Sequence, residues 1–223
     1  MATLDVRELR SALTEVAVPA DAGQMAAYMR HRSTYLGVKT PARRAASKGV
    51  FVDARSASAT DLIDFADACW AEPEREFQYV GSDVLARNCE RLLPGQIDDL
   101  RRLIATKAWW DTVDALASPT VGEMIRLHPQ LLATMDAWVD DQDFWLGRTA
   151  ILHQLRFEEA TDADRLFAYC ARRAGDTEFF VRKAIGWALR QYARTDPDAV
   201  RRFVAETELS GLSRREALKH LGA

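Results

Sequence analysis

Three stretches of the chain each begin with two aromatic residues and continue with the apolar spacing of a helix: Trp109–Leu116 (WWDTVDAL), Phe144–Leu155 (FWLGRTAILHQL) and Phe179–Tyr192 (FFVRKAIGWALRQY). Successive doublets are separated by 35 residues. A unit of this length holds two helices and their turns, and such pairs bury their apolar faces only by stacking on neighbouring pairs. The sequence therefore predicts an all-α fold, a HEAT-like helical repeat solenoid with a concave groove, in one domain over residues 1–223.

Helical spacing extends over most of the remaining chain. Val6, Leu9 and Leu13 share one helix face, whereas alternating strand patterns and hairpin dipeptides are almost absent. Prolines directly follow a residue of the helix-capping type at Thr40-Pro41, Ser118-Pro119 and Asp196-Pro197. A new helix is predicted to start at each of these pairs.

Composition narrows the class of protein. Hydrophobic residues make up 48% of the 223 residues, which is enough for a real core. No apolar run approaches the roughly 20 residues of a bilayer span, and the first residues, MATLDVRELRSALTEV, have amphipathic spacing unlike a signal peptide. Three scattered cysteines (Cys69, Cys89 and Cys170) fit neither a disulfide framework nor a zinc site. The sequence predicts a reduced, soluble, cytoplasmic protein.

The net charge of −3 hides an uneven distribution. Arginine recurs in adjacent pairs, at Arg43 and Arg44, Arg172 and Arg173, Arg201 and Arg202, and Arg214 and Arg215. These pairs are typical of solvated helix surfaces. They are also compatible with one basic face, and a polyanion responds to such a face and not to the total charge.

Matched positions of a stacked repeat lie side by side, so the period maps a surface. Three residues after the second aromatic, the units carry Val113, Arg148 and Lys183. Two neighbouring cations in a groove suit a phosphate backbone. The first aromatics (Trp109, Phe144 and Phe179) are predicted to wedge into the core, and the second (Trp110, Trp145 and Phe180) are compatible with core or groove.

Two further residues share helix faces with these positions. Asp114 follows Trp110 by four residues, and Trp187 follows Lys183 by four, in the helix that Phe180 opens. An ion-pair carboxylate explains Asp114 equally well, and core packing explains Trp187. Spacing alone leaves both interpretations open.

Other catalytic signals are weak. The histidines His31, His128, His153 and His220 lack metal-ligand spacing, and neither a phosphate-binding glycine loop nor a nucleophile-elbow serine is present. We therefore expect no metal and no cofactor, and chemistry that relies on carboxylate, aromatic and cationic side chains.

The chain resembles the AlkD family of bacterial DNA glycosylases, which repair alkylated bases. The resemblance is carried, in family order, by Met25–Arg44, Trp70–Val80, Leu103–Leu116, Phe144–Phe157, Glu178–Val200 and Leu212–Leu221. KAWWDTVD and EFFVRKAIGWALR are its most specific parts, because other HEAT-like proteins share the apolar spacing but not these polar insertions.

This resemblance implies an activity: monofunctional hydrolysis of the N-glycosidic bond of N3- or N7-alkylpurines in duplex DNA, without flipping the base. It implies catalytic roles for Asp114, Trp110 and Trp187. DNA contacts are implied at Arg148, at the groove residue Tyr28 and at the backbone-contacting pair Thr40 and Arg44, and the repeat map adds Lys183 and Phe180. A nucleoid-associated cytoplasmic monomer that binds alkylated double-stranded DNA is expected.

Three alternatives stay open at this point. The first is a DNA-binding scaffold of the same fold without activity, and the second is a HEAT-like solenoid that seats a partner helix. The third is a self-resistance glycosylase for bulky minor-groove adducts. The sequence does not reveal the preferred lesion.

Overall fold

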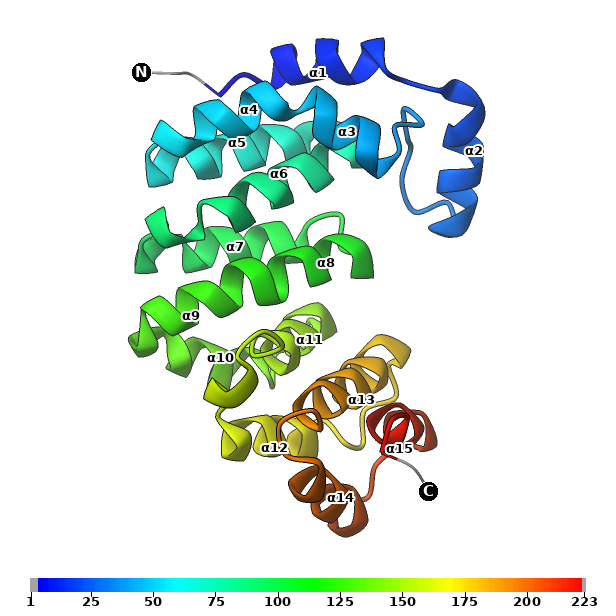
Figure 1. Ribbon diagram of the computed structural model, residues 1–223, viewed down its shortest axis with the longest axis vertical. Helices are drawn as coiled ribbons and strands as arrows, with labels where there is room; N and C mark the ends of the chain where they lie inside the picture. The colour runs from blue at the N-terminus through cyan, green and yellow to red at the C-terminus, as the bar shows by residue number, and fades with distance from the viewer. Residues whose placement is uncertain (1–3, 222–223) are drawn as a thin grey trace. The chain divides into compact units, whose positions relative to one another are not determined.

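A computed structural model describes residues 4–221, and every regular element in this range is a helix (Figure 1). The predicted all-α fold of helical repeats is confirmed. The chain divides into two compact units, Met1–Ala115 and Leu116–Ala223. A single domain over the whole length stays a prediction. No helix of the described part has the length and apolar character that a membrane span needs.

The first unit is built from α1 (Val6–Glu15), α2 (Pro19–Tyr28), α3 (Thr40–Ala46), α4 (Lys48–Asp53), α5 (Ala59–Ala71), α6 (Arg75–Arg87), α7 (Ile97–Ala105) and the start of α8 (Trp110–Leu116). Short 3₁₀ turns lie at Ala54–Ser56, Cys89–Arg91 and Pro94–Gln96. α5 packs against α6 and α7, and α1 packs against α3 and α5. The predicted apolar face of α1 is buried at Leu9 and Leu13.

The second unit begins with a π-helical turn, Ala117–Gly122, and continues with α9 (Glu123–Leu127), α10 (Leu132–Trp138), α11 (Phe144–Leu152), α12 (Ala163–Arg172), α13 (Phe179–Tyr192), α14 (Pro197–Glu206) and α15 (Gly211–Leu218). Its 3₁₀ turns are Pro129–Leu131 and Glu158–Ala160. α13 packs between α11 and α15. A Cβ added at Gly186 of α13 would lie 2.8 Å from the Ser213 carbonyl oxygen, so glycine allows this close helix approach.

Helices begin at all three aromatic doublets, as the period predicts: α8 at Trp110, α11 at Phe144 and α13 at Phe179. The expectation that every first aromatic is a core wedge is wrong for Phe179, which is 55% exposed. Trp109 is buried, and Phe144 is intermediate. Phe179 lies in the first turn of α13, and its ring contacts the ring of Phe180 edge-on.

The three predicted caps have different outcomes. Asp196 does cap α14, accepting a hydrogen bond from the Ala199 amide at 2.8 Å. Thr40 is itself the first helical residue of α3 and not its cap. No helix starts at Ser118, because Ser118 and its proline lie inside the π-helical turn. A π-helical turn tolerates proline, because the turn already interrupts the i→i−4 hydrogen bonds that a proline would remove.

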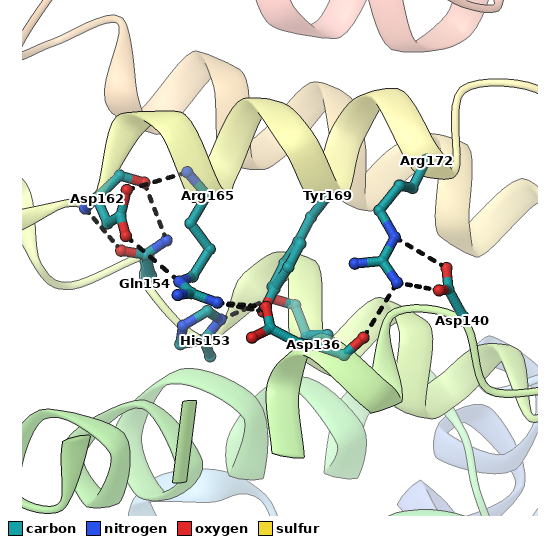
Figure 2. A network of polar contacts seen from close by, with 9 residues as sticks. Asp136, Asp140, His153, Gln154, Asp162, Arg165, Tyr169 and Arg172 are labelled. Atoms are coloured by element: carbon teal, nitrogen blue, oxygen red, sulfur yellow. Dashed lines mark hydrogen bonds and ion pairs between the residues drawn. The ribbon is translucent and has the colours of Figure 1, made fainter. Parts of the chain in front are cut away.

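A polar network joins α12 to α10 and the residues that follow it (Figure 2). The Tyr169 hydroxyl donates to Asp136 Oδ1 at 2.7 Å, and Arg165 forms an ion pair with the same carboxylate. Arg172 reaches Asp140 and the Asp136 carbonyl. His153 lies beneath this network, 1% exposed, with Nδ1 at 2.6 Å from the Ala150 carbonyl oxygen. Nδ1 therefore carries the proton and donates to this oxygen.

Burial makes His153 a source of acid sensitivity. Desolvation lowers its pKa from 6.5 to about 4, an effect to which the charge of Arg165 adds. Below pH 6.5 the unfolded chain binds a proton that the folded chain excludes, so the free energy of unfolding falls down to about pH 4. We expect His153 to lower the free energy of unfolding by about 2 kcal/mol as the pH falls from about 7 to about 5.

Urea unfolding of wild type and His153→Gln at both pH values measures this contribution. Glutamine does not titrate but keeps an N–H donor, so the variant is expected to be less stable at neutral pH and less sensitive to acid. Equal pH dependence in the two proteins would show that folding does not shift the pKa of His153.

Candidate functional site

A cavity of about 610 Å³ opens in the first unit beside α2, α3, α6 and α8. Three of the sequence-predicted site residues line it: Tyr28, Thr40 and Trp110. Tyr28 is 75% exposed, and its ring meets the Trp110 ring edge-on with the centroids 6.3 Å apart. The structure therefore brings together an aromatic corner that the sequence placed only in separate segments.

Other wall residues were not anticipated. Tyr35, Tyr79 and Asp111 contribute to the wall, as do the cationic residues Lys39 and Arg43. These side chains add aromatic surface, hydroxyl donors and positive charge. The cavity thus suits a ligand that has both flat rings and anionic groups.

Arg43 is the buried member of the arginine pair on α3. It is 8% exposed, its guanidinium lies 4.7 Å from the Tyr79 ring centroid, and Nη2 is 3.8 Å from Asp83 Oδ2. Burial lowers the pKa of Arg43 from its ordinary value. Arg44, the predicted backbone contact, is exposed on the same helix and is not part of the cavity wall.

Asp111 anchors the first turn of α8. Arg75, only 1% exposed, grips its carboxylate with two N–H groups, of which Nε is 3.0 Å from Oδ2. The same guanidinium donates to the Lys107 carbonyl at 2.8 Å and to Thr112 Oγ1 at 2.9 Å. This buried, bidentate ion pair ties α6 to the segment that carries Trp110.

Tyr79 completes the pairing of Asp111. Its hydroxyl donates to Asp111 Oδ2 at 2.7 Å and lies 3.3 Å from the Tyr35 hydroxyl. Burial, and secondarily the Asp111 charge, raise the pKa of Tyr79 well above its ordinary value. The hydroxyl therefore stays protonated and serves as a donor at the cavity wall.

The loop between α2 and α3 is held by a second buried carboxylate. Glu76 is fully buried and accepts hydrogen bonds from the amides of Leu36, Gly37 and Val38 at 3.1, 2.9 and 3.0 Å. Gly37 has a φ of +88°, and a Cβ there would lie 2.0 Å from the Val18 carbonyl oxygen. Only glycine fits this position, which sets the loop that presents Tyr35 and Lys39 to the cavity.

Asp114, the predicted catalytic carboxylate, lies on α8 four residues after Trp110, and both side chains are half-buried. On a helix this spacing places them on one face. The structure agrees with the sequence reading that indole and carboxylate share one short helix.

The second unit carries the other predicted residues, on α11 and α13. Phe180, Lys183 and Trp187 are half-buried along one face of α13, whose opposite positions are fully buried. The Lys183 ammonium is 2.7 Å from Glu216 Oε1 on α15, and Arg190 pairs with the same carboxylate. These two cations hold the pKa of Glu216 below its ordinary range.

Arg148 on α11 is 3% exposed and donates to the Phe180 carbonyl. Its guanidinium carbon lies 5.9 Å from the Phe180 ring centroid, and the Trp145 ring lies 5.0 Å from the same ring. Arg148 and Phe180 are therefore brought together within the second unit. The convergence of Asp114 and Trp110 with Trp187 and Arg148, which belong to the two different units, stays a prediction.

Among the described residues, no group of three or more His, Cys, Asp or Glu side chains is placed to hold a metal ion. His153, Cys69 and Cys170 are buried. Desolvation raises the pKa of both of these thiols. They therefore do not act as thiolate nucleophiles.

Comparison with known proteins gives a consistent result. A family model described as DNA alkylation repair enzyme matches residues 9–221. The chain belongs to this family. A solved structure described as a "Predicted DNA alkylation repair enzyme from Enterococcus faecalis" is 34% identical, covers 92% of this chain and 97% of its own, and superposes with a TM-score of 0.87. No curated protein matches the chain.

In this DNA alkylation repair protein, the residues that sequence reasoning missed lie close to those it found. Tyr79 falls within the segment Trp70–Val80 that carries the resemblance, and Asp111 directly follows Trp110. Arg75 and Asp111 are 36 residues apart, close to the repeat length, but many other polar pairs have a similar separation. A single carboxylate near a helix start, such as Asp111, is otherwise interpreted as a surface or capping residue.

The buried pair between Arg75 and Asp111 gives a stability prediction for this family member. Arg75→Met leaves the Asp111 carboxylate buried without its cation, and we expect a loss of about 3–5 kcal/mol in urea unfolding. The double variant Arg75→Met with Asp111→Leu removes the orphaned charge and is expected to regain part of this loss. A double variant no more stable than Arg75→Met would contradict the ion-pair account.

Proposed function

We propose that the protein is a monofunctional DNA glycosylase that excises cationic N3- and N7-alkylpurines from duplex DNA. The observation that carries this proposal is the cavity lined by aromatic and cationic side chains, among them Trp110. Trp110 lies on the same helix as Asp114, and the chain belongs to the DNA alkylation repair enzyme family. The similar Enterococcus faecalis protein is described as a predicted DNA alkylation repair enzyme.

The reaction needs little acid catalysis for such substrates. Alkylation at N3 or N7 places a positive charge on the purine, so cleavage of its bond to C1′ releases a neutral base. The electron pair of that bond goes to the base, and positive charge develops on the deoxyribose. Water then adds to C1′ and loses a proton. A site without a histidine acid is therefore adequate.

Asp114 is assigned to the developing positive charge. A carboxylate held beside the deoxyribose stabilises an oxocarbenium-like transition state more than the ground state, and it orients the attacking water. Preorganised groups of this kind are worth about 3 kcal/mol. Asp111 is not assigned this role, because Arg75, Tyr79 and the Thr112 amide already engage its oxygens.

The indoles of Trp110 and Trp187 are assigned to the sugar and the cationic base. Electron-rich ring faces stabilise a neighbouring cation by about 1–2 kcal/mol when water is excluded. Tyr28, edge-on to Trp110, extends this surface and is mostly exposed. An open wall of this kind suits a base that stays in the helix better than one flipped into a closed pocket.

Phosphate contacts complete the proposal. Thr40 on α3 lines the first unit's cavity, and the exposed Arg44 lies on the same helix outside the cavity wall. Lys183 on α13 is partly exposed. We assign these residues, with Phe180, to holding the DNA without reading its sequence. The buried Arg148 is assigned to positioning Phe180, to whose carbonyl it donates. Ordinary duplex DNA is then bound mainly by charge, with a strong dependence on salt.

Asp114→Asn tests the catalytic assignment. The amide keeps the shape but lacks the charge, so we expect release of methylated base to fall by roughly a hundredfold or more, with DNA affinity largely kept. Single-turnover base release and a binding titration measure the two quantities. Asp98→Asn, at an exposed carboxylate on α7, is the matched control and is expected to act as wild type. Wild-type rates in Asp114→Asn would remove it from the mechanism.

Substrate charge gives an independent test. We expect 7-methylguanine and 3-methyladenine to be released, because each leaves as a neutral base, and we expect neutral etheno-adducts to be poor substrates. Competing duplexes with one lesion each, followed by chromatography of the free bases, rank the rates. Excision of an etheno-adduct as fast as of a cationic lesion would contradict the proposed leaving-group chemistry.

A further inference from the structure

A second cavity of the first unit, about 940 Å³, lies against the opposite face of α2. Ala22, Gly23 and Ala26 of α2 line it, whereas Gln24, Met25 and Tyr28 line the Trp110 cavity. A helix turns by about 100° per residue, so these two sets of residues point in opposite directions. α2 itself has no buried residue among the ten that form it, which agrees with a helix bordered by open space on two sides.

The charge of this second cavity has one sign. Its cationic residues are Arg32 and Lys107, and among the described residues that line it none is an aspartate or glutamate. The nearby carboxylates of Glu72 and Glu74 are paired with Arg10. A concave surface with cations and no lining carboxylate attracts anions.

Both cations are held in place. The Lys107 ammonium donates to the carbonyls of Trp70 and Glu72 at 2.6 and 2.7 Å, and a primary ammonium has a third N–H to offer. The Arg32 guanidinium carbon lies 5.0 Å from the Trp109 ring centroid. Preorganised donors lose less entropy on binding an anion than freely moving ones.

The remaining wall has mostly small side chains. Alanine and glycine on α2 allow a bulky backbone to approach closely, and Ser33 brings a hydroxyl group. The Thr34 hydroxyl already donates to the Pro73 carbonyl at 2.9 Å. Phosphodiester oxygens accept hydrogen bonds from hydroxyl, ammonium and guanidinium groups alike. This lining therefore favours a phosphate chain over an apolar ligand.

We propose that this second cavity binds the phosphodiester backbone of DNA, as a contact separate from the Trp110 cavity on the other face of α2. The proposal rests on the proposed function only in taking DNA as the partner. It assigns Arg32 and Lys107 to phosphate binding and no role in breaking the glycosidic bond.

Two neighbouring substitutions on α2 test it. Ala26→Glu places a carboxylate in the second cavity, whereas Ala27→Glu adds the same charge at an exposed residue that lines neither cavity. For undamaged duplex DNA we expect Ala26→Glu to weaken binding by about tenfold and to reduce the slope of log affinity against log salt by about 1. Ala27→Glu is expected to stay within about twofold of wild type. Equal losses in both variants would overturn the proposal.

Arg32→Gln provides a second route, because it removes a cation without adding bulk. We expect a reduced salt slope, and we expect Arg30→Gln, which changes an exposed arginine outside the cavity wall, to keep the wild-type slope. Wild-type slopes in both Arg32→Gln and Ala26→Glu would also overturn the proposal.

Inorganic phosphate distinguishes the source of the anion. We expect it to compete only weakly with DNA, since a single ion lacks the other contacts of the duplex. If Ala26→Glu loses phosphate binding but keeps wild-type DNA affinity, the cavity is a free-anion site and the proposal fails. If the variants behave as expected but the wild-type protein releases no alkylated base, the glycosylase assignment fails and the DNA contact stands.

Discussion

Two adjacent buried charges at the start of α6 hold the first unit's cavity in place. Arg75 reaches forward to Asp111 and the Lys107 carbonyl, and Glu76 reaches back to three amides of the Leu36–Val38 loop. Each charge has several partners, which offsets the cost of its burial. Because the partners of Arg75 flank Trp110 and those of Glu76 precede Thr40, a single helical turn positions both walls.

The same type of contact recurs along the chain at about one repeat length. Within the first unit, Trp70 donates to the Leu103 carbonyl across 33 residues, and Arg75 pairs with Asp111 across 36. Within the second, Lys183 pairs with Glu216 across 33 residues. Stacked repeats contact their immediate neighbours, so polar contacts between layers must have this spacing. The 35-residue period of the aromatic doublets is thus the interval at which successive layers are also tied by side chains.

The sequence could predict what depends on local pattern. The helix starts at Trp110, Phe144 and Phe179 follow from aromatic and apolar spacing, and the structure confirms them. Ser118 was misread because a proline after a serine has the same local pattern at a helix start and inside a π-helical turn. Arg75 and Tyr79 were missed because their roles depend on a partner in the next layer, and single-sequence spacing does not say which polar residues of two layers face each other. Contacts between layers are tertiary information.

Asp111 shows why residue type and position on a helix do not by themselves assign chemistry. It lies in the first turn of α8, where a guanidinium, a tyrosine hydroxyl and a backbone amide engage its carboxylate. A carboxylate held in this way is already stabilised in the ground state, so a developing cation gains less from it. Asp111 thereby supplies the buried partner that Arg75 requires. The chemistry proposed for α8 is assigned to Asp114 because it lies one helical turn after Trp110. Asp111, Glu72 and Glu216 each pair with a cation, so part of the chain's negative charge is neutralised within these contacts.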